Sequence, residues 1–344
     1  MTARNLLQIS AFRFPQWFLP SLLLGLSILC GLGLTVPAEA NADPGASKVI
    51  YGVYINNLEN IELTNNSYSV DRYLWLRWKD PKSYPSTSIE FMNTVHGYDA
   101  VQIQRLFDQP ADMPDGSKYM AFRVQGAFNS KMDLAKYPFD VQKLTMEFED
   151  STNSSNILEY VPDDNPITIS DNLTLPGYLV GKPIASAGAH RYPTNFGDLS
   201  AGGQPSYSRI TITLPVTRNV LPSVVKIIVP IFIVVFITSL VFLLPAHMAD
   251  SRVGIGITAM LTMVALQWTT TSALPNVSYL MMIDLVYMLS IGYVLATMAY
   301  TVVASRRAKH DTGESTLDRR VGIASLIAYI ALIILTVVVF LRIG

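Results

Sequence analysis

The chain has 344 residues, half of them hydrophobic, and a formal net charge of −1. This balance excludes nucleic acid as a partner, because the sequence has no basic domain and no basic stripe. The average composition conceals a division of the chain into two parts. Residues up to about 217 are polar and mixed, whereas long apolar runs dominate from residue 219 onward.

Residues 1–42 have the parts of a secretory signal peptide. Arg4 and Arg13 precede an apolar stretch, and small residues suited to cleavage follow at Ala38 and Ala40. The alternative is an uncleaved membrane anchor. The only cysteine, Cys30, lies inside this segment, so a cleaved chain would have no disulfide although its soluble part is exported.

Residues 43–217 are predicted to form an extracellular all-β domain. Short alternating runs are separated by turn residues such as Asp115-Gly116, Gly197-Asp198 and Gly202-Gly203, and no convincing helical pattern interrupts them. This favours an immunoglobulin-like β-sandwich of about 170 residues. The predicted strands are Val49–Ile55, Tyr68–Trp78, Lys118–Phe128, Gln142–Phe148, Gly177–Val180 and Ser208–Leu214.

Alternation along residues 73–78 separates two faces of one predicted strand. Leu74, Leu76 and Trp78 fall on one side and look like core, whereas Tyr73 and Trp75 fall on the other. Aromatic side chains exposed on a monomer suit a subunit interface or a ligand site.

Residues 218–344 are predicted to be a transmembrane domain. Each of four apolar segments is long enough to cross the roughly 30 Å hydrocarbon layer as a helix. The positive-inside rule places the short basic link, residues 305–320, in the cytoplasm, and the β-domain and the C-terminus outside the cell membrane. The helices are expected at about 220–244, 252–273, 279–304 and 321–343.

The second apolar segment is two-sided. Small and hydroxyl-bearing residues recur at steps of three and four along one helix face, together with one leucine. Such a stripe either lines a water-filled path among several copies or lets helices pack closely. The stripe consists of Asp250, Gly254, Thr258, Leu261, Ala265, Trp268, Thr269 and Ser272.

Residues Ser130–Leu144, SKMDLAKYPFDVQKL, resemble the signature loop of the pentameric ligand-gated ion channels, the Cys-loop receptor superfamily. The family's animal members close this loop with two cysteines. Ser130 and Leu144 stand at those positions here, which is similar to prokaryotic members that lack the disulfide.

The stretch that begins at Arg252, RVGIGITAMLTM, and the later LPNVSY resemble the second helix and following loop of glycine and GABA-type receptors. Arg218 before the first helix and Pro230 inside it also match. The resemblance implies a homopentamer around a central pore, which makes the pore-lining interpretation of the stripe the stronger one. Membrane lipids and permeant ions are then partners.

The resemblance implies a role for single pore residues. Leu261 and Ala265 would form an apolar gate that excludes water. Trp268 either narrows the outer pore or turns into the gap between helices, and the second arrangement is favoured.

Ion selectivity is predicted to depend on Asp250. Anion channels of the family place Pro-Ala before the arginine, whereas this chain has Asp250-Ser251. Five carboxylates at the cytoplasmic mouth favour cations, although Arg252 lies close enough to offset them. An acidic residue here also suits the helix dipole. An anion-selective channel is the alternative.

Coupling between the two domains is expected at their junction. Asp140 and Arg218 would form an ion pair, with Glu62 as a third member, and such a pair either gates or only stabilises. Asp284 either receives the movement or simply reaches the membrane interface. The other predicted coupling residues are Pro138, Phe139, Pro275, Asn276 and Tyr279.

A ligand is expected between subunits. Aromatic side chains beside carboxylates either hold a cationic amine or merely pack the interface. The predicted residues are Tyr73 and Trp75 on one side, and Glu149, Asp150, Tyr192, Phe196 and Tyr207 on the other. The acidic group Glu147, Glu149 and Asp150 is either solvated surface or a site for protons or a divalent cation.

An enzyme is disfavoured, because the sequence has no cysteine nucleophile in the mature chain, no metal-spaced cluster and no phosphate loop. No cofactor is predicted, and a metal site stays undecided. A non-conducting, membrane-anchored sensor is the rival to a channel.

Overall fold

The computed structural model describes residues 45–80, 84–95, 101–197, 203–308 and 316–343. The predicted signal peptide, residues 1–42, lies outside the described residues. Two of the predicted turns, Gly197-Asp198 and Gly202-Gly203, lie partly outside them.

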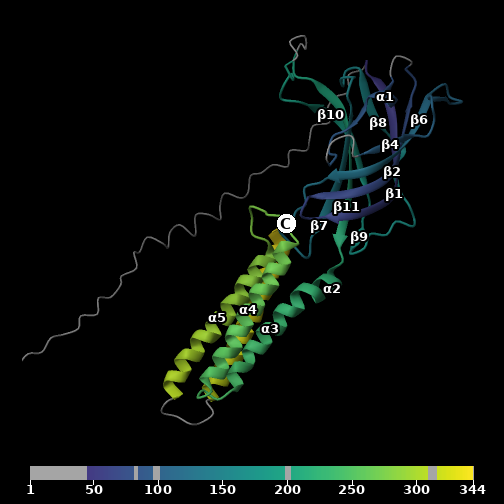
Figure 1. Cartoon of the computed structure of the whole chain (residues 1–344). Coiled ribbons are helices and arrows are strands. Elements are labelled where there is room, and N and C mark those ends of the chain that lie inside the picture. The colour runs from purple at the N-terminus through teal and green to yellow at the C-terminus, as the bar shows by residue number, and fades with distance from the viewer. Residues whose placement is uncertain (1–44, 81–83, 96–100, 198–202, 309–315, 344) are drawn as a thin grey trace, which may run out of the picture. The chain divides into compact units, whose positions relative to one another are not determined.

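The described strands form two sheets that pack as a sandwich, which confirms the predicted fold class (Figure 1). The six-stranded sheet has the order β4-β6-β2-β1-β8, with β5 also paired to β6, and the five-stranded sheet has the order β10-β11-β7-β3, with β9 paired to β11. The first sheet contains β1 (Ser47–Glu62), β2 (Ser67–Trp78), β4 (Gln102–Arg105), β5 (Ala111–Asp112), β6 (Lys118–Asn129) and β8 (Leu158–Ile169). The second contains β3 (Ile89–Phe91), β7 (Val141–Asp150), β9 (Tyr178–Val180), β10 (Ile184–Arg191) and β11 (Ser206–Arg218), and a short helix, α1 (Pro85–Ser88), precedes β3.

The sandwich core follows the predicted alternation of β2. Leu74, Leu76 and Trp78 are buried, whereas Tyr73 and Trp75 are only partly covered. The core also holds a charge, because Arg72 is fully buried between the rings of Phe91 and Phe128, 4.9 and 4.3 Å from their centroids.

Five strands, β3, β4, β5, β8 and β10, were not predicted from the sequence, and the two longest of them, β8 and β10, lie at sheet edges. β8 contains two prolines, Pro162 and Pro166, and prolines in a sequence usually indicate a turn. They are tolerated at the edge of a sheet, where one row of amides needs no partner. β10 is rich in alanine and glycine, which have low strand propensity. Its continuous register with β11, from Ile184 opposite Thr213 to Arg191 opposite Ser206, holds it in the sheet.

Four helical spans are long and apolar enough to cross a membrane. The first is not uniform: α2 (Val220–Ser223), a π-helical turn (Val224–Ile228), α3 (Val229–Ser239) and a 3₁₀ turn (Leu240–Leu243) follow one another. Pro230 explains the π-helical turn, because proline lacks the amide hydrogen and its ring collides with the carbonyl four residues earlier. The others are α4 (Ala249–Ser272), α5 (Met282–Ala308) and α6 (Thr316–Ile343).

These spans pack as a bundle, in which α4 contacts α3 and α5, and α5 contacts α6 (Figure 1). Three helices begin a few residues away from the approximate starts that were predicted. α4 and α6 begin earlier, at Ala249 and Thr316, because their first turns are polar and give no hydropathy signal. α5 begins at Met282 rather than Tyr279, because the Met282 amide donates to the Ala135 carbonyl instead of starting a helical turn upstream.

Candidate functional site

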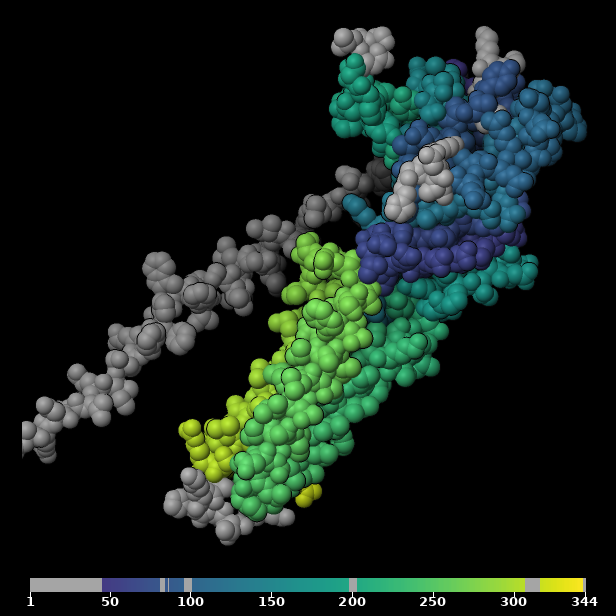
Figure 2. All heavy atoms as spheres, viewed as in Figure 1, coloured from purple at the N-terminus to yellow at the C-terminus, as the bar shows by residue number. Residues whose placement is uncertain are grey.

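All eight residues of the predicted stripe are exposed on α4. Leu261 and Trp268 are 67% and 76% exposed, although both are large and apolar. The buried residues of α4 are Arg252, Gly256, Ala259 and Met263. At about 100° per residue these four centre on the opposite side of the helix. Figure 2 shows the green atoms of this segment lying open at the surface.

The two glycines of α4 distinguish a packing face from an open one. A Cβ added to Gly256 would lie 2.6 Å from Met298 of α5, so the close helix contact is made there. A Cβ added to Gly254, which belongs to the stripe, would meet nothing within 4 Å. Within one chain, Gly254 therefore takes no part in close helix packing.

Arg252 lies on the packed side of α4. Its Nη2 donates to a carboxylate oxygen of Asp318 on α6 at 2.7 Å and to the Leu244 carbonyl. Tyr300 of α5 donates its hydroxyl to the other oxygen of Asp318 at 2.7 Å. Asp250, two residues before Arg252, is exposed.

Asp140 and Arg218 form the predicted ion pair. Nε and Nη2 of Arg218 donate to the two carboxylate oxygens at 2.7 and 2.9 Å, and Gln142 donates to one of the same oxygens. Glu62 does not join them: it is exposed at the end of β1 and accepts from Asn65 at 2.8 Å. The prediction that Glu62 joins Asp140 and Arg218 was therefore wrong for a single chain.

The signature loop, Ser130–Leu144, contacts the loop between α4 and α5. The Leu134 amide donates to the Tyr279 hydroxyl at 3.0 Å, and the Ala135 carbonyl accepts from Met282 at 2.8 Å. Asp284 accepts from the Met281 amide at 3.0 Å and thereby caps the start of α5.

The remaining coupling residues lie in these two loops. Pro138 is buried and follows a cis peptide bond, Phe139 and Pro275 are partly covered, and Asn276 is exposed.

A polar and aromatic cluster lies where β7, β10 and β11 meet. Glu149 accepts from the Tyr192 hydroxyl at 3.0 Å and from Nε of Arg209, and His190 Nδ1 lies 3.4 Å from the same carboxylate. Arg209 also reaches Glu147 at 3.2 Å. We call these five residues the Glu149 cluster.

Two further predicted ligand residues border this cluster. The rings of Phe196 and Tyr207 have centroids 5.2 and 6.0 Å from that of Tyr192. Phe196 is exposed at the tip of the β10–β11 hairpin, with a φ of 54°.

The charges in the cluster influence one another. Burial tends to lower the pKa of Arg209, but its hydrogen bond with Glu149 and the charges of Glu149 and Glu147 outweigh burial and raise that pKa. Burial and the hydrogen bond to Glu149 raise the pKa of Tyr192. The cluster thus keeps its guanidinium charged and its phenol neutral.

Asp150 is not part of the Glu149 cluster, because adjacent strand residues point to opposite faces. Its carboxylate accepts from Ser88 at 2.5 Å and from the amides of Thr152 and Asn153. The predicted acidic group is therefore divided between the two faces of β7. Arg209 supplies the counter-charge for Glu147 and Glu149 on one face, and Asp150 lies on the other. Among the described residues, no group of three acidic, histidine or cysteine side chains could hold a metal ion.

Tyr73 and Trp75 lie on the other sheet, on β2. Arg123 covers the Tyr73 ring at 5.7 Å from the centroid. The Trp75 indole lies so close to Gly52 that an added Cβ would be 2.0 Å from the ring, and its Nε1 donates to Asp163 at 3.1 Å. One chain therefore does not bring these two residues to the Glu149 cluster.

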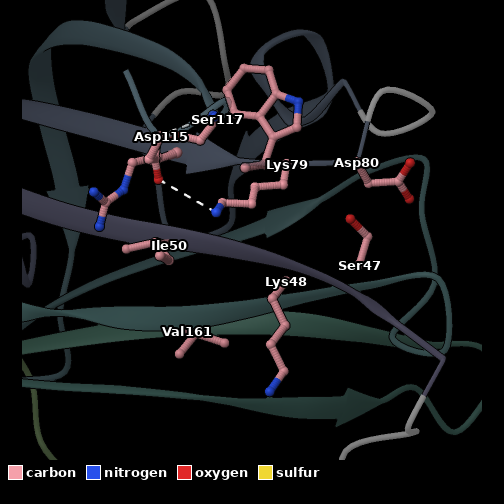
Figure 3. A pocket seen from close by; sticks show the side chains of 10 residues that line it. Ser47, Lys48, Ile50, Lys79, Asp80, Asp115, Ser117 and Val161 are labelled. Carbon is pink, nitrogen blue, oxygen red and sulfur yellow. Dashed lines mark hydrogen bonds and ion pairs between the residues drawn. The ribbon is translucent and has the colours of Figure 1, made fainter. Parts of the chain in front are cut away.

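A separate cavity of about 390 Å³ lies beside the start of β1 and the end of β2 (Figure 3). Lys79 points across it toward Asp115, with 3.7 Å between Nζ and the carboxylate. It contains none of the predicted ligand residues.

Four residues at these sites were not predicted from the sequence. His190 and Arg209 lie on strands next to predicted aromatic residues of the hairpin expected at His190–Tyr207, so the register of β10 with β11 would have indicated them. Asp318 and Tyr300 are separated from Arg252 by whole helices, and no periodicity connects them.

Comparison with known proteins gives one family and several relatives. Residues 227–322 match the family model of the neurotransmitter-gated ion-channel transmembrane region. The chain is 26% identical over 282 residues to the gamma-aminobutyric acid receptor subunit rho-3 of Homo sapiens, an alignment that covers 75% of this chain and 58% of the relative. It is 24% identical over 272 residues to the theta subunit of Mus musculus, covering 73% and 40% respectively. The chain thus spans only about half the length of these relatives.

Proposed function

The chain belongs to the superfamily of pentameric ligand-gated ion channels, and on this premise we propose that it forms a cation-conducting channel opened by a ligand that binds its β-domain. Five copies would surround a central pore lined by α4. The β-domain and the C-terminus would lie on the extracytoplasmic side of the cell membrane.

One observation carries the proposal: the α4 stripe is exposed, whereas the opposite side of α4 packs on α3 and α5. Exposed small and hydroxyl-bearing residues on a membrane helix suit a water-filled path. The hydroxyls of Thr258 and Thr269 donate back to carbonyls of their own helix at 2.9 Å, so their oxygens remain available as acceptors toward the axis. Leu261, in the middle of the stripe, is the candidate gate.

Cation selectivity is supported by the two charges at the cytoplasmic end of α4. Asp250 is exposed on the stripe, whereas Arg252 is buried and paired with Asp318. Five unpaired carboxylates at a narrow mouth would concentrate cations. An anion channel is the second candidate, favoured by the likeness of α4 to glycine and GABA-type receptors.

The proposed ligand is a small amine bound at the Glu149 cluster together with Phe196 and Tyr207. Glu147 and Glu149 carry two negative charges against the one of Arg209, so these three groups leave a net negative charge that favours a cation. Gamma-aminobutyric acid is a candidate, since the relatives are named as its receptors, and protons remain a second trigger.

Coupling would run from the sandwich through the signature loop to the helices. Asp140 holds Arg218, the last residue of β11, and the next helix begins at Val220. Tyr279 and Met282 connect the same loop to the start of α5. Movement of β11 would therefore reach α3 along the chain and α5 by contact.

The test is to reconstitute the protein in planar bilayers and measure reversal potentials in asymmetric potassium chloride, across pH and with a panel of amines. We expect a reversal near the potassium equilibrium potential that moves toward zero in Asp250→Ala. Ser251→Ala, at an exposed neighbouring position, serves as the matched control and should leave the reversal potential unchanged. A reversal near the chloride potential would favour the anion channel, and silence even in Leu261→Thr would favour a sensor.

A further inference from the structure

The cytoplasmic end of α4 is fastened by a buried ion pair that involves all four membrane spans. Arg252 of α4 is 1% exposed and Asp318 of α6 is 8% exposed, with 2.7 Å between Nη2 and the carboxylate. The Leu244 carbonyl, at the end of the first span, and the Tyr300 hydroxyl, on α5, complete the arrangement.

The pair is asymmetric in its hydrogen bonds. Among the described residues, Nε and Nη1 of Arg252 are buried without a hydrogen-bond partner. Nη2 therefore makes both described hydrogen bonds of the guanidinium, to Leu244 and to Asp318, and Asp318 supplies the carboxylate that neutralises the charge. Removing one partner of a buried pair leaves an uncompensated charge, which is costly.

The pair also fixes the direction of the Arg252 side chain. Asp250 and Arg252 are two residues apart, so they project about 200° apart around the helix. Asp250 lies on the exposed face of α4 with the rest of the stripe, whereas Arg252 lies on the buried face. An arginine side chain is long enough to turn its charge toward water if nothing holds it.

We infer that Asp318 sets ion selectivity indirectly, as a positioning residue: it retains and neutralises Arg252 inside each subunit, so that the Asp250 carboxylates alone determine the field at the cytoplasmic mouth. This inference rests on the proposed channel function. Without Asp318, five guanidinium groups would have no carboxylate partner and would offset the five aspartates. The charge on α6, on the side of α4 opposite the proposed pore lining, would thereby decide which ions pass.

The test compares permeability ratios of potassium to chloride in planar bilayers for the full-length protein and three variants. We expect Asp318→Asn to lower the ratio about tenfold, the lower end of what charged clefts do to local ion concentrations. Adding Arg252→Gln to Asp318→Asn should restore the ratio, because the released charge is then absent. Asp318→Glu keeps the carboxylate and should stay near the wild-type ratio.

A second variant covers the case in which Asp318→Asn fails to assemble as a pentamer on size exclusion. Tyr300→Phe keeps both charges and the ring but removes one hydrogen bond from Asp318, and we expect a ratio lowered about two- to threefold. A purely structural pair would change thermal stability in these variants and leave the ratio unchanged.

The outcomes separate the inference from the proposed function. A cation-selective wild type whose ratio is unchanged in Asp318→Asn and in Tyr300→Phe would overturn the inference alone. An anion-selective wild type, or silence in both the wild type and Leu261→Thr, would overturn the proposed cation channel and the inference with it.

Discussion

Asp140 and Arg218 form a two-pronged ion pair that joins the signature loop to the residue where the β-sandwich ends. Their side chains are 1% and 11% exposed. The guanidinium carbon also lies 4.8 Å from the ring centroids of both Tyr137 and Tyr178. Burial tends to lower the pKa of Arg218, but the hydrogen bonds and charge of Asp140 outweigh it and raise that pKa. Arg218 therefore stays charged over the whole physiological range.

We expect Asp140→Asn to be strongly destabilising, because it leaves the Arg218 charge buried without its partner. Breaking a buried pair in this way costs about 3–5 kcal/mol. Thermal unfolding in detergent, followed by circular dichroism, would measure the loss. Asp112→Asn is the matched control, since Asp112 forms a largely exposed pair with Lys118 that is worth at most about 1 kcal/mol. Equal losses in the two variants would contradict the assigned burial.

Leu261→Thr should open the proposed channel without ligand. Burial of one leucine side chain is worth about 1.5–3 kcal/mol, so replacing the predicted apolar ring should raise the resting open probability about tenfold or more. Single-channel recording in the absence of amines would measure this. Val264→Thr makes the same type of change at an exposed position of α4 outside the stripe. A larger leak in Val264→Thr would mean that a different face lines the pore.

The adjacent acids Glu149 and Asp150 should behave differently. Glu149→Gln removes the carboxylate that holds Arg209 and Tyr192, and we expect at least a tenfold loss of amine sensitivity, since a hydrogen bond to a charged group is worth about 1.5–3 kcal/mol. Asp150→Asn should instead lower the melting temperature, because that carboxylate is used by Ser88 and two backbone amides. Dose–response curves and thermal melts of both variants test this, and the reverse pattern would refute the assignment.

Replacing Arg72 with methionine should not weaken the sandwich. Burial lowers the pKa of Arg72 to about 10, so the group is still charged at neutral pH and its desolvation opposes folding. Among the described residues none of its three side-chain nitrogens has a hydrogen-bond partner. We expect Arg72→Met to be neutral or to stabilise by about 1–4 kcal/mol in thermal unfolding. Arg72→Ala is the contrast, because it leaves a cavity, and a strong loss in the methionine variant would show that the charge itself is needed.

Asp71 should make the sandwich sensitive to acid. Hydrogen bonds from Arg123 chiefly, and from Asn56, hold the pKa of Asp71 below its usual value of 3.8. A depressed pKa contributes stability that is complete above the unfolded value and is lost as pH falls through the lower, folded value. Melting temperatures measured from pH 6 down to pH 3 should therefore converge between the wild type and Asp71→Asn. Parallel curves would show that Asp71 does not titrate in this window.

The sequence by itself determined the parts of this protein and their order. Alternation assigned the two faces of β2, apolar length identified the four membrane spans, and periods of three and four separated the α4 stripe from the rest. These features depend on local geometry alone, because side chains repeat every two residues in a strand and every 3.6 in a helix. The pair of Asp140 and Arg218 came from resemblance, and the structure confirms that they are in contact.

Only the tertiary structure decided which distant charges meet. β7 and β11 pair in a register that brings Glu149 opposite Arg209, and this placed the arginine in the cluster and left Asp150 on the other face. Packing of α6 on the bundle brought Asp318 to Arg252 across 66 residues of sequence. Charged contacts of this kind follow from how elements pack, and no local repeat encodes them. They could therefore not be predicted from the residue pattern of the sequence alone.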